Sequence, residues 1–337
     1  MKSIYGMTME KLEEYFLSLG EKKFKATQIY EWIYQKRIKS FDEVTNIKKT
    51  VIDKLKEDFT IDRLDTLKVE RDVEVCKYLF ALNDNERVES VLMRHDYGTS
   101  LCISSQVGCN MGCRFCESGR LKKVRNLESS EMVLQILQVE EDIHERISHV
   151  VIMGIGEPFD NYDNFVDFIK IVNNPKGIAL GSRHITVSTC GIIPKIREFA
   201  TLPFQVNLAI SLHASNDTLR SSIMPINKAY PLKDLIKEIK SYIAKTNRRV
   251  TFEYIMLDNV NDSEENAKEL ALLLKGINCY VNLIPYNETE NIEFKRTKEW
   301  KIMKFYDILK KNKINVTIRK EFGGSVDAAC GQLRANN

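Results

Sequence analysis

Short β-branched runs alternate with helical segments from Leu101 to the C-terminus, and this alternation constrains the fold more than any other feature. The expected strands lie at residues 148–153, 184–188, 206–212, 249–256, 279–285 and 315–319. The expected helices lie at residues 128–142, 161–171, 231–244, 263–274 and 297–311. The pattern predicts a parallel α/β fold with about six strand–helix repeats, a partial (β/α)6 TIM-like barrel. Chemistry is expected in the loops that follow the C-terminal ends of its strands.

The chain before residue 99 shows two other patterns. Apolar residues recur at helical spacing from Met7 to Phe59, whereas residues 73–95 alternate as strands do. We therefore predict three parts: a helical accessory domain over residues 1–60, a linking β segment over 61–98 and a core domain over 99–337.

One group of cysteines has the spacing Cys-x3-Cys-x2-Cys, at Cys109, Cys113 and Cys116. Three thiolates can hold three irons of a 4Fe-4S cube and leave the fourth iron open. An open iron can bind the amino and carboxylate groups of S-adenosylmethionine and pass an electron into its sulfonium, which yields a 5′-deoxyadenosyl radical. Zinc is the competing interpretation, but structural zinc sites usually have two Cys or Cys/His pairs, and no second pair lies nearby. The spacing therefore predicts radical chemistry.

Composition indicates the compartment more than the partner. Eight cysteines in 337 residues are too few for a disulfide scaffold and are more typical of metal or redox chemistry in the cytosol. The N-terminus lacks the charged and apolar segments of a leader, and no apolar run approaches the roughly 18 residues of a membrane span. We expect a cytoplasmic protein with no membrane partner. The net charge of +3 does not by itself establish a nucleic-acid partner.

Polar motifs lie at the C-terminal ends of three expected strands, those at residues 148–153, 184–188 and 206–212. Gly154-Ile-Gly-Glu157 follows the first of these strands; its glycines allow a ligand to approach the backbone, and Glu157 supplies an acceptor. Ser188 ends the second strand, and Ser211 and His213 end the third, where they could contact a ribose. Each motif also has an ordinary structural alternative as a turn or a cap.

Eight segments together make the chain resemble the RlmN/Cfr family of radical S-adenosylmethionine RNA methyltransferases. The segments are residues 20–29, 104–109, 154–158, 183–189, 209–214, 224–227, 281–287 and 327–333. The chain most resembles the RlmN branch, the dual-specificity 23S rRNA and tRNA adenine-C2 methyltransferases. The resemblance implies a radical SAM barrel. It also implies methylation of C2 of an adenosine in the peptidyl-transferase region of 23S rRNA, and of the adenosine 3′ of the anticodon in some tRNAs.

The resemblance also assigns residue roles. The three clustered cysteines would ligate one 4Fe-4S cluster. Seven residues would contact S-adenosylmethionine: Gly156, Glu157, Ser188, Ser211, Leu212, His213 and Asn287. Cys330 would carry the methyl group in a C-terminal loop, Cys102 would be its partner in a transient disulfide, and Glu89 would accept a proton.

These thiols fit the chemistry of C2 of adenine, an electron-poor carbon that does not attack a methyl sulfonium directly. The Cys330 thiolate would take a methyl group from one S-adenosylmethionine by displacement. A radical from a second molecule would remove hydrogen from that methyl group, and the methylene radical would add to the base. Cys102 would then attack the Cys330 sulfur and release the product. Two S-adenosylmethionine molecules per turnover follow, with an electron donor such as flavodoxin or ferredoxin.

Alternatives stay open for both residues and function. By strand context alone, Cys102 is a buried hydrophobe and Glu89 a solvent-facing carboxylate. Core packing is predicted for the cysteines in other apolar runs: Cys76, Cys190 and Cys279. A Cfr-like enzyme would instead methylate C8 of adenine in 23S rRNA and confer antibiotic resistance. Further rivals are a radical enzyme with a non-RNA substrate and a non-enzymatic iron-sulfur or zinc protein.

Two basic segments bear on the partners that the resemblance implies, which are tRNA and 23S rRNA before full ribosome assembly. Residues 21–40 and 120–125 could hold RNA phosphates or could be solvated faces. The chain also departs from the family just after the cysteines. Glu117 stands where a small residue is usual, and the Gly-Gly-like turn of many RlmN members is missing. The local geometry near the cofactor is therefore left open by the resemblance.

Overall fold

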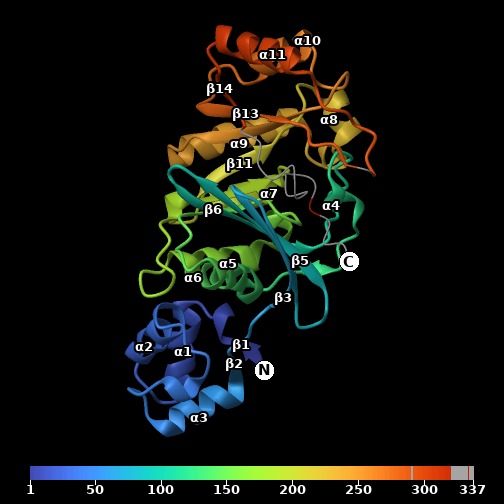
Figure 1. Ribbon diagram of the computed structural model, residues 1–337. Helices are drawn as coiled ribbons and strands as arrows, with labels where there is room; N and C mark the ends of the chain where they lie inside the picture. The colour runs from blue at the N-terminus through green and yellow to red at the C-terminus, as the bar shows by residue number, and fades with distance from the viewer. Residues whose placement is uncertain (290, 320–332, 334–337) are drawn as a thin grey trace.

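The computed structural model describes residues 1–289, 291–319 and 333. Its core is a ten-stranded sheet of order β14-β13-β12-β11-β10-β9-β6-β5-β4-β3 (Figure 1). The strands are β3 (Asp65–Arg71), β4 (Val75–Ala81), β5 (Arg87–His95), β6 (Gly98–Ile103), β9 (His149–Ile152), β10 (Ile185–Thr189), β11 (Asn207–Ser211), β12 (Val250–Met256), β13 (Cys279–Pro285) and β14 (Asn315–Ile318).

Strands β6 and β9 to β14 run parallel to one another, and helices connect each of these strands to the next. The helices are α5 (Ser129–Ile143), α6 (Tyr162–Asn173), α7 (Ile193–Phe199), α8 (Asp217–Ile223), α9 (Leu232–Thr246), α10 (Glu264–Leu273) and α11 (Glu299–Lys311). Six strand–helix units therefore run from β6 to α11, and β14 follows them. The predicted partial barrel is confirmed.

The predicted linking β segment continues the same sheet. Strands β3, β4 and β5 pair antiparallel, and β5 pairs antiparallel with β6, so that Val91 lies opposite Cys102. Two small pairs lie outside this sheet: β1 (Lys2–Ser3) with β2 (Phe59–Thr60), and β7 (Gln106–Val107) with β8 (Arg125–Asn126). The domain boundaries at residues 60 and 98 stay a prediction.

The N-terminal part is helical, as its apolar spacing predicts, and Figure 1 shows it beside α5 and α6. Its helices are α1 (Met9–Ser18), α2 (Phe24–Tyr30) and α3 (Lys49–Asp58). Short helical turns complete the chain: η1 (Ile4–Gly6), η2 (Glu31–Gln35), η3 (Phe41–Glu43), α4 (Glu117–Arg120), η4 (Pro158–Asn161), η5 (Ser182–His184) and η6 (Pro225–Lys228). Arg37 forms an ion pair with Glu140 of α5, and the Ser129 hydroxyl donates to the Gly6 carbonyl at 3.4 Å. These contacts attach the helical part to the core.

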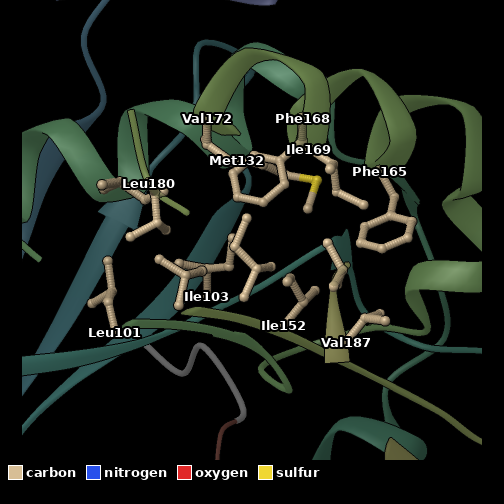
Figure 2. Packing of buried hydrophobic residues seen from close by; sticks show 14 of the residues in the cluster. Leu101, Ile103, Met132, Ile152, Phe165, Phe168, Ile169, Val172, Leu180 and Val187 are labelled. Carbon is tan, nitrogen blue, oxygen red and sulfur yellow. The ribbon is translucent and has the colours of Figure 1, made fainter. Parts of the chain in front are cut away.

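The main hydrophobic core lies between the sheet and the helices that cover it. Alternate strand residues, among them Leu101, Ile103 and Ile152, point toward Met132 of α5 and Phe168 of α6 (Figure 2). Fully burying such side chains contributes roughly 1.5–3 kcal/mol each. The intervening strand residues face the opposite side of the sheet, where the candidate site lies. No helix in the described part of the chain is both long and apolar enough to cross a membrane.

Candidate active site

A pocket lies at the C-terminal ends of the parallel strands, where the fold predicts chemistry. All three clustered cysteines line it, together with residues that follow β9, β10 and β11. The predicted site residues in its wall are Cys109, Cys113, Cys116, Gly156, Glu157, Ser188, Ser211 and His213. The structure thus brings together eight of the positions that the sequence singled out.

Tight backbone contacts shape the cysteine loop. Gly108 has φ +71°, and a side-chain carbon on it would lie 2.2 Å from the Lys122 carbonyl oxygen. A side-chain carbon on Gly119 would lie 2.6 Å from the Cys113 carbonyl oxygen. Both positions therefore require glycine. Gly119 thus allows α4 (Glu117–Arg120) to pack against Cys113.

Cys109 is buried and Cys113 and Cys116 are partly exposed, and their surroundings bear on what they could hold. Burial raises the pKa of Cys109 to about 12 and the pKa of Cys113 well above the usual range for a thiol. Free thiols here would stay protonated, whereas a bound cation reverses this preference. Nowhere in the described residues do three His, Cys, Asp or Glu side chains gather as ligands of a single metal ion. The three thiols line one pocket but are not placed to ligate a single ion. This spacing suits a cluster of several irons better than one zinc ion.

The Gly154–Glu157 turn packs against the end of β6. A side-chain carbon on Gly154 would lie 2.7 Å from the Ile103 carbonyl oxygen. Gly156 has φ +109°, and a side-chain carbon there would lie 2.6 Å from Gln106. The glycines are thus required by the protein's own packing, in addition to any ligand, and this packing turns Glu157 into the pocket.

Glu157 is buried, and backbone N–H groups donate to both oxygens of its carboxylate. The N–H of Cys190 donates to one oxygen at 2.7 Å, and the N–H of Phe159 donates to the other at 3.0 Å. Burial raises the pKa of Glu157 although these hydrogen bonds oppose the shift. Side-chain hydrogen bonds from Thr189 and Cys190 also lower its pKa, and none of these donors carries a positive charge. No cationic side chain of the described residues forms an ion pair with it.

Serine hydroxyls and one histidine complete the wall. The hydroxyl oxygens of Ser188 and Ser211 lie 3.3 Å apart on adjacent strands. His213 has φ +59°, an uncommon conformation for a residue other than glycine. Its Nδ1 accepts from the Ile255 N–H at 3.0 Å, which assigns the ring proton to Nε2. Burial, followed by the Arg220 charge, lowers the pKa of His213 to about 3, so the ring is a neutral donor.

Two predicted contacts lie outside the pocket wall of the described residues. Leu212 is fully buried, and its N–H donates to the Glu253 carbonyl at 3.1 Å, which leaves no donor for a ligand. Asn287 is half-buried, two residues after β13 ends. Their roles stay predictions.

Cys102 and Glu89 lie on the pocket side of the sheet. Cys102 is 6% exposed and packs with Val91, Met93 and Leu333. Glu89 is 5% exposed rather than solvent-facing, and its carboxylate lies 3.6 Å from the Lys77 ammonium. The strand-context expectation of a solvent-facing Glu89 is therefore wrong, because β4 and β6 flank β5 on both sides. Cys330 lies outside the described residues.

Leu333 connects the C-terminal segment to the cysteine loop. Its side chain is 4% exposed beside Cys102, and its carbonyl accepts from the Ser118 hydroxyl at 2.7 Å. Ser118 is two residues after Cys116 and lines the pocket. A residue three positions after Cys330 therefore contacts both the Cys102 wall and the cysteine loop.

Sequence reasoning missed several charged groups of the pocket. Glu253 is buried in β12, where the Asn282 amide donates to it at 2.8 Å, and burial raises its pKa. A single carboxylate inside the apolar run Val250–Met256 was a usable signal. Arg319 also lines the pocket, and Arg220 lies fully buried behind it. The buried Cys190 lines the pocket as well as packing in an apolar cluster.

Protein partners neutralise most of the two basic segments. Lys23 pairs with Glu13 at 3.1 Å, Lys25 with Glu21 at 2.7 Å, and Arg37 and Lys39 pair with carboxylates of α5. In the second segment, Arg120, Lys123 and Arg125 pair with Glu117, Asp160, Asp84 and Glu131. Charge counting alone therefore overstated the cationic surface offered to phosphates.

Comparison with known proteins agrees with this geometry. Residues 103–271 match the radical SAM superfamily, and residues 2–61 match the ribosomal RNA large subunit methyltransferase N-terminal domain. The fold and the cysteine-lined pocket thus define a radical SAM protein. The chain is 54% identical to a probable dual-specificity RNA methyltransferase RlmN of Enterococcus faecalis, over 99% of this chain and 96% of that protein.

Two further relatives extend over the whole chain. An RlmN of Spiroplasma citri, also named a probable dual-specificity RNA methyltransferase, is 53% identical over 100% of this chain and 98% of its own length. A crystal structure of a radical SAM methyltransferase from Sphaerobacter thermophilus has a TM-score of 0.93 and 40% identity, and the match covers 100% of both chains. The chain belongs to the RlmN family.

Proposed function

We propose that this radical SAM RNA methyltransferase methylates C2 of an adenosine in the peptidyl-transferase region of 23S rRNA, and the adenosine 3′ of the anticodon in some tRNAs. The names of its RlmN relatives and its N-terminal domain support RNA as the substrate. The observation that carries the proposal is the packing of Cys102 with Leu333, whose carbonyl accepts from Ser118 of the cysteine-lined pocket, with the buried Glu89 on the neighbouring strand. An acid and a thiol at this position are the groups that release from a thioether adduct requires.

The proposal assigns Cys109, Cys113 and Cys116 as ligands of one 4Fe-4S cluster, which supplies the electron that cleaves S-adenosylmethionine. Three other groups suit the remaining parts of that substrate. Glu157 offers carboxylate acceptors to the N–H bonds of its amino group, and Ser188 and Ser211 offer hydroxyls to a ribose. The neutral His213 can donate from Nε2 without adding a second positive charge beside a sulfonium.

The thiols would divide the transfer between them. Cys330 accepts a methyl group from the first S-adenosylmethionine, and a bond forms between that carbon and C2 after a second molecule has supplied the radical. Loss of one electron and transfer of the C2 proton to Glu89 restore the aromatic ring. The Cys102 thiolate then attacks the Cys330 sulfur, the bond from sulfur to the methylene carbon breaks, and the released carbon takes a proton to become the methyl group. An external dithiol must then reduce the Cys102–Cys330 disulfide. A three-residue span reaches at most about 10 Å, so the contact of Leu333 with Cys102 supports a meeting of the two thiols.

The remaining partners follow from this chemistry. Each turnover uses two S-adenosylmethionine molecules and an external electron, for which a flavodoxin or ferredoxin in the cytoplasm is suited. Lys22 and Lys122 are exposed and are candidates for phosphate contacts. Exposed ion pairs such as Lys23–Glu13 contribute only about 0–1 kcal/mol, so their lysines can exchange partners when RNA binds.

The test is product analysis. Anaerobically reconstituted protein with reductant and labelled S-adenosylmethionine should place the label in 2-methyladenosine of protein-free 23S rRNA and of tRNA. Digestion and mass spectrometry distinguish this product from 8-methyladenosine, which would indicate a Cfr-like enzyme. Label in neither RNA, with intact cleavage of S-adenosylmethionine, would indicate a substrate other than RNA.

A further inference from the structure

Arg220 is a fully buried cation behind the pocket, with 0% of its surface exposed. Its guanidinium makes four hydrogen bonds, all to neutral oxygens. It donates from Nε to the Leu212 carbonyl at 3.1 Å, from Nη1 to the Asn227 side-chain oxygen at 3.1 Å, and from Nη2 to the carbonyls of Cys190 at 2.6 Å and Ser211 at 3.1 Å. Its donors are therefore nearly satisfied, but its charge is not.

No carboxylate among the described residues forms an ion pair with Arg220. The nearest acid that acts on it is Asp217, which is exposed and accepts instead from the Leu232 N–H at 2.8 Å and the Asn227 amide at 2.9 Å. Solvent weakens the field of an exposed carboxylate. A buried ion without a close opposite charge costs several kcal/mol, and arginine does not escape this cost by losing its proton.

Two of the carbonyls that accept from Arg220, those of Cys190 and Ser211, belong to residues of the pocket wall. Cys113 and Cys190 are the two thiols whose negative charge would act on Arg220. Both line the pocket, and Cys113 is one of the three proposed cluster ligands. A 4Fe-4S cube held by three thiolates carries a net negative charge that increases on reduction. A buried cation without a carboxylate partner among the described residues thus contacts the wall of the pocket in which an anionic group is proposed.

We propose that Arg220 is the buried counter-charge of the cluster, a positioning residue that favours its one-electron reduction. The inference rests on the proposed ligation by the three cysteines. An added negative charge is stabilised by a fixed positive charge in a site that excludes water, so Arg220 raises the reduction potential. The same side chain joins the ends of β10 and β11 through three carbonyls, which holds the serine-lined edge in place.

Charge and hydrogen bonding can be separated by substitution. Arg220→Gln removes the charge, whereas Arg220→Lys keeps the charge and loses the planar fork. Arg248 is a matched control at the other end of β11, because it also donates to backbone carbonyls, those of Phe204 and Val206. Arg248→Gln therefore removes a similar side chain far from the cysteines.

The experiment is a redox titration of the full-length reconstituted protein, followed by the electron paramagnetic resonance of the reduced cluster, with dithionite as donor. At the potential that half-reduces the native cluster, Arg220→Gln should lower the ratio of reduced to oxidised cluster about tenfold. Arg220→Lys should stay within about threefold of the native ratio, and Arg248→Gln should match it.

Two results would overturn the inference. One is an Arg220→Gln variant that binds its full complement of iron and shows the same ratio of reduced to oxidised cluster as the native protein. The other, decisive if that variant does not fold, is a tenfold fall in Arg220→Lys, which would show that the fork matters and the charge does not. A native protein that binds no iron would instead refute the proposed cluster ligation, so the two failures are distinguishable.

Discussion

Two buried glutamates at opposite ends of the parallel strands show how the protein treats a charge that it needs for folding and one that it offers to a ligand. Glu140, just before β9, pairs with Arg37 and with Arg146 at 3.3 Å, and accepts from the Ile147 N–H at 2.8 Å. Glu157, just after β9, accepts from the N–H groups of Phe159 and Cys190, and no cationic side chain of the described residues pairs with it. The first charge is compensated within the chain, whereas the second is left for a cationic partner.

The same contrast holds for the buried cations and thiols. Arg220 of α8 has no carboxylate partner in the described part of the chain, and burial raises the pKa of Cys113 and Cys190. Folding alone gains nothing from such groups, because each costs desolvation free energy. Uncompensated charge of both signs in one pocket therefore indicates a ligand set that carries both signs.

The largest effect is expected from the cysteine loop. Cys113→Ala should abolish iron binding and reductive cleavage of S-adenosylmethionine, because two thiolates cannot hold a cube with one open iron. Iron content and 5′-deoxyadenosine formation measure both. Cys279→Ala, a buried thiol at the start of β13, is the matched control and should keep its iron. Equal iron loss in both variants would contradict a specific role for the cysteines at the pocket end of the strands.

Cys102→Ala should stop turnover after one round, because the thiol that releases the product is missing. A covalent adduct between Cys330 and RNA should accumulate, seen as a nuclease-sensitive shift on a denaturing gel. Cys330→Ala should form no adduct, and neither should the variant that lacks both thiols. Cys76→Ala serves as control, since Cys76 lies on the core side of β4. Normal turnover of Cys102→Ala would return Cys102 to the role of a small buried hydrophobe.

Patterns within short stretches of sequence were enough to predict most of the fold and the cysteine site. The β-branched runs predicted β12 and β13 closely, because a buried parallel strand is apolar along its whole length. The cysteine trio was predictable because its ligands are adjacent in sequence. Glycines in the Gly154–Glu157 turn were also recognised, although their packing against Gln106 was not.

The remaining features depend on contacts between residues that are distant in sequence, and short stretches of sequence do not predict them. Arg220 looks like one charge on a short amphipathic helix, and its burial depends on β10 and β11. The basic segments lose their charge to acids far along the chain, as Arg37 does to Glu140. The linking β segment joins the core sheet only through the pairing of β5 with β6. Each outcome depends on which distant elements pack together.

The two glutamates give a third, intermediate effect. Glu157→Gln should weaken S-adenosylmethionine binding about tenfold, because a charge-assisted hydrogen bond contributes roughly 1.5–3 kcal/mol. Its unfolding free energy should change little, since the buried charge that it loses was unfavourable. Glu140→Gln should do the reverse: binding stays native and stability falls, because Arg37 and Arg146 lose their partner. Calorimetric titration measures the affinity for S-adenosylmethionine, and chemical denaturation measures the unfolding free energy. Equal changes of both quantities in the two variants would show that the two glutamates do not differ in role.

The smallest effect concerns His213 and the stability of the protein without ligands. Its pKa is about 3 in the folded state against about 6.5 in an unfolded chain, so the unfolded state alone gains a proton between these values. Stability should therefore fall by about 1.4 kcal/mol for each pH unit below 6. His213→Asn removes this slope and keeps an acceptor for Ile255 in the same left-handed backbone conformation. His144→Asn, exposed and with φ +53°, is the control. Urea denaturation at pH 7, 6 and 5 measures the difference between native and variant, and equal slopes in all three proteins would show that His213 is not held neutral by burial.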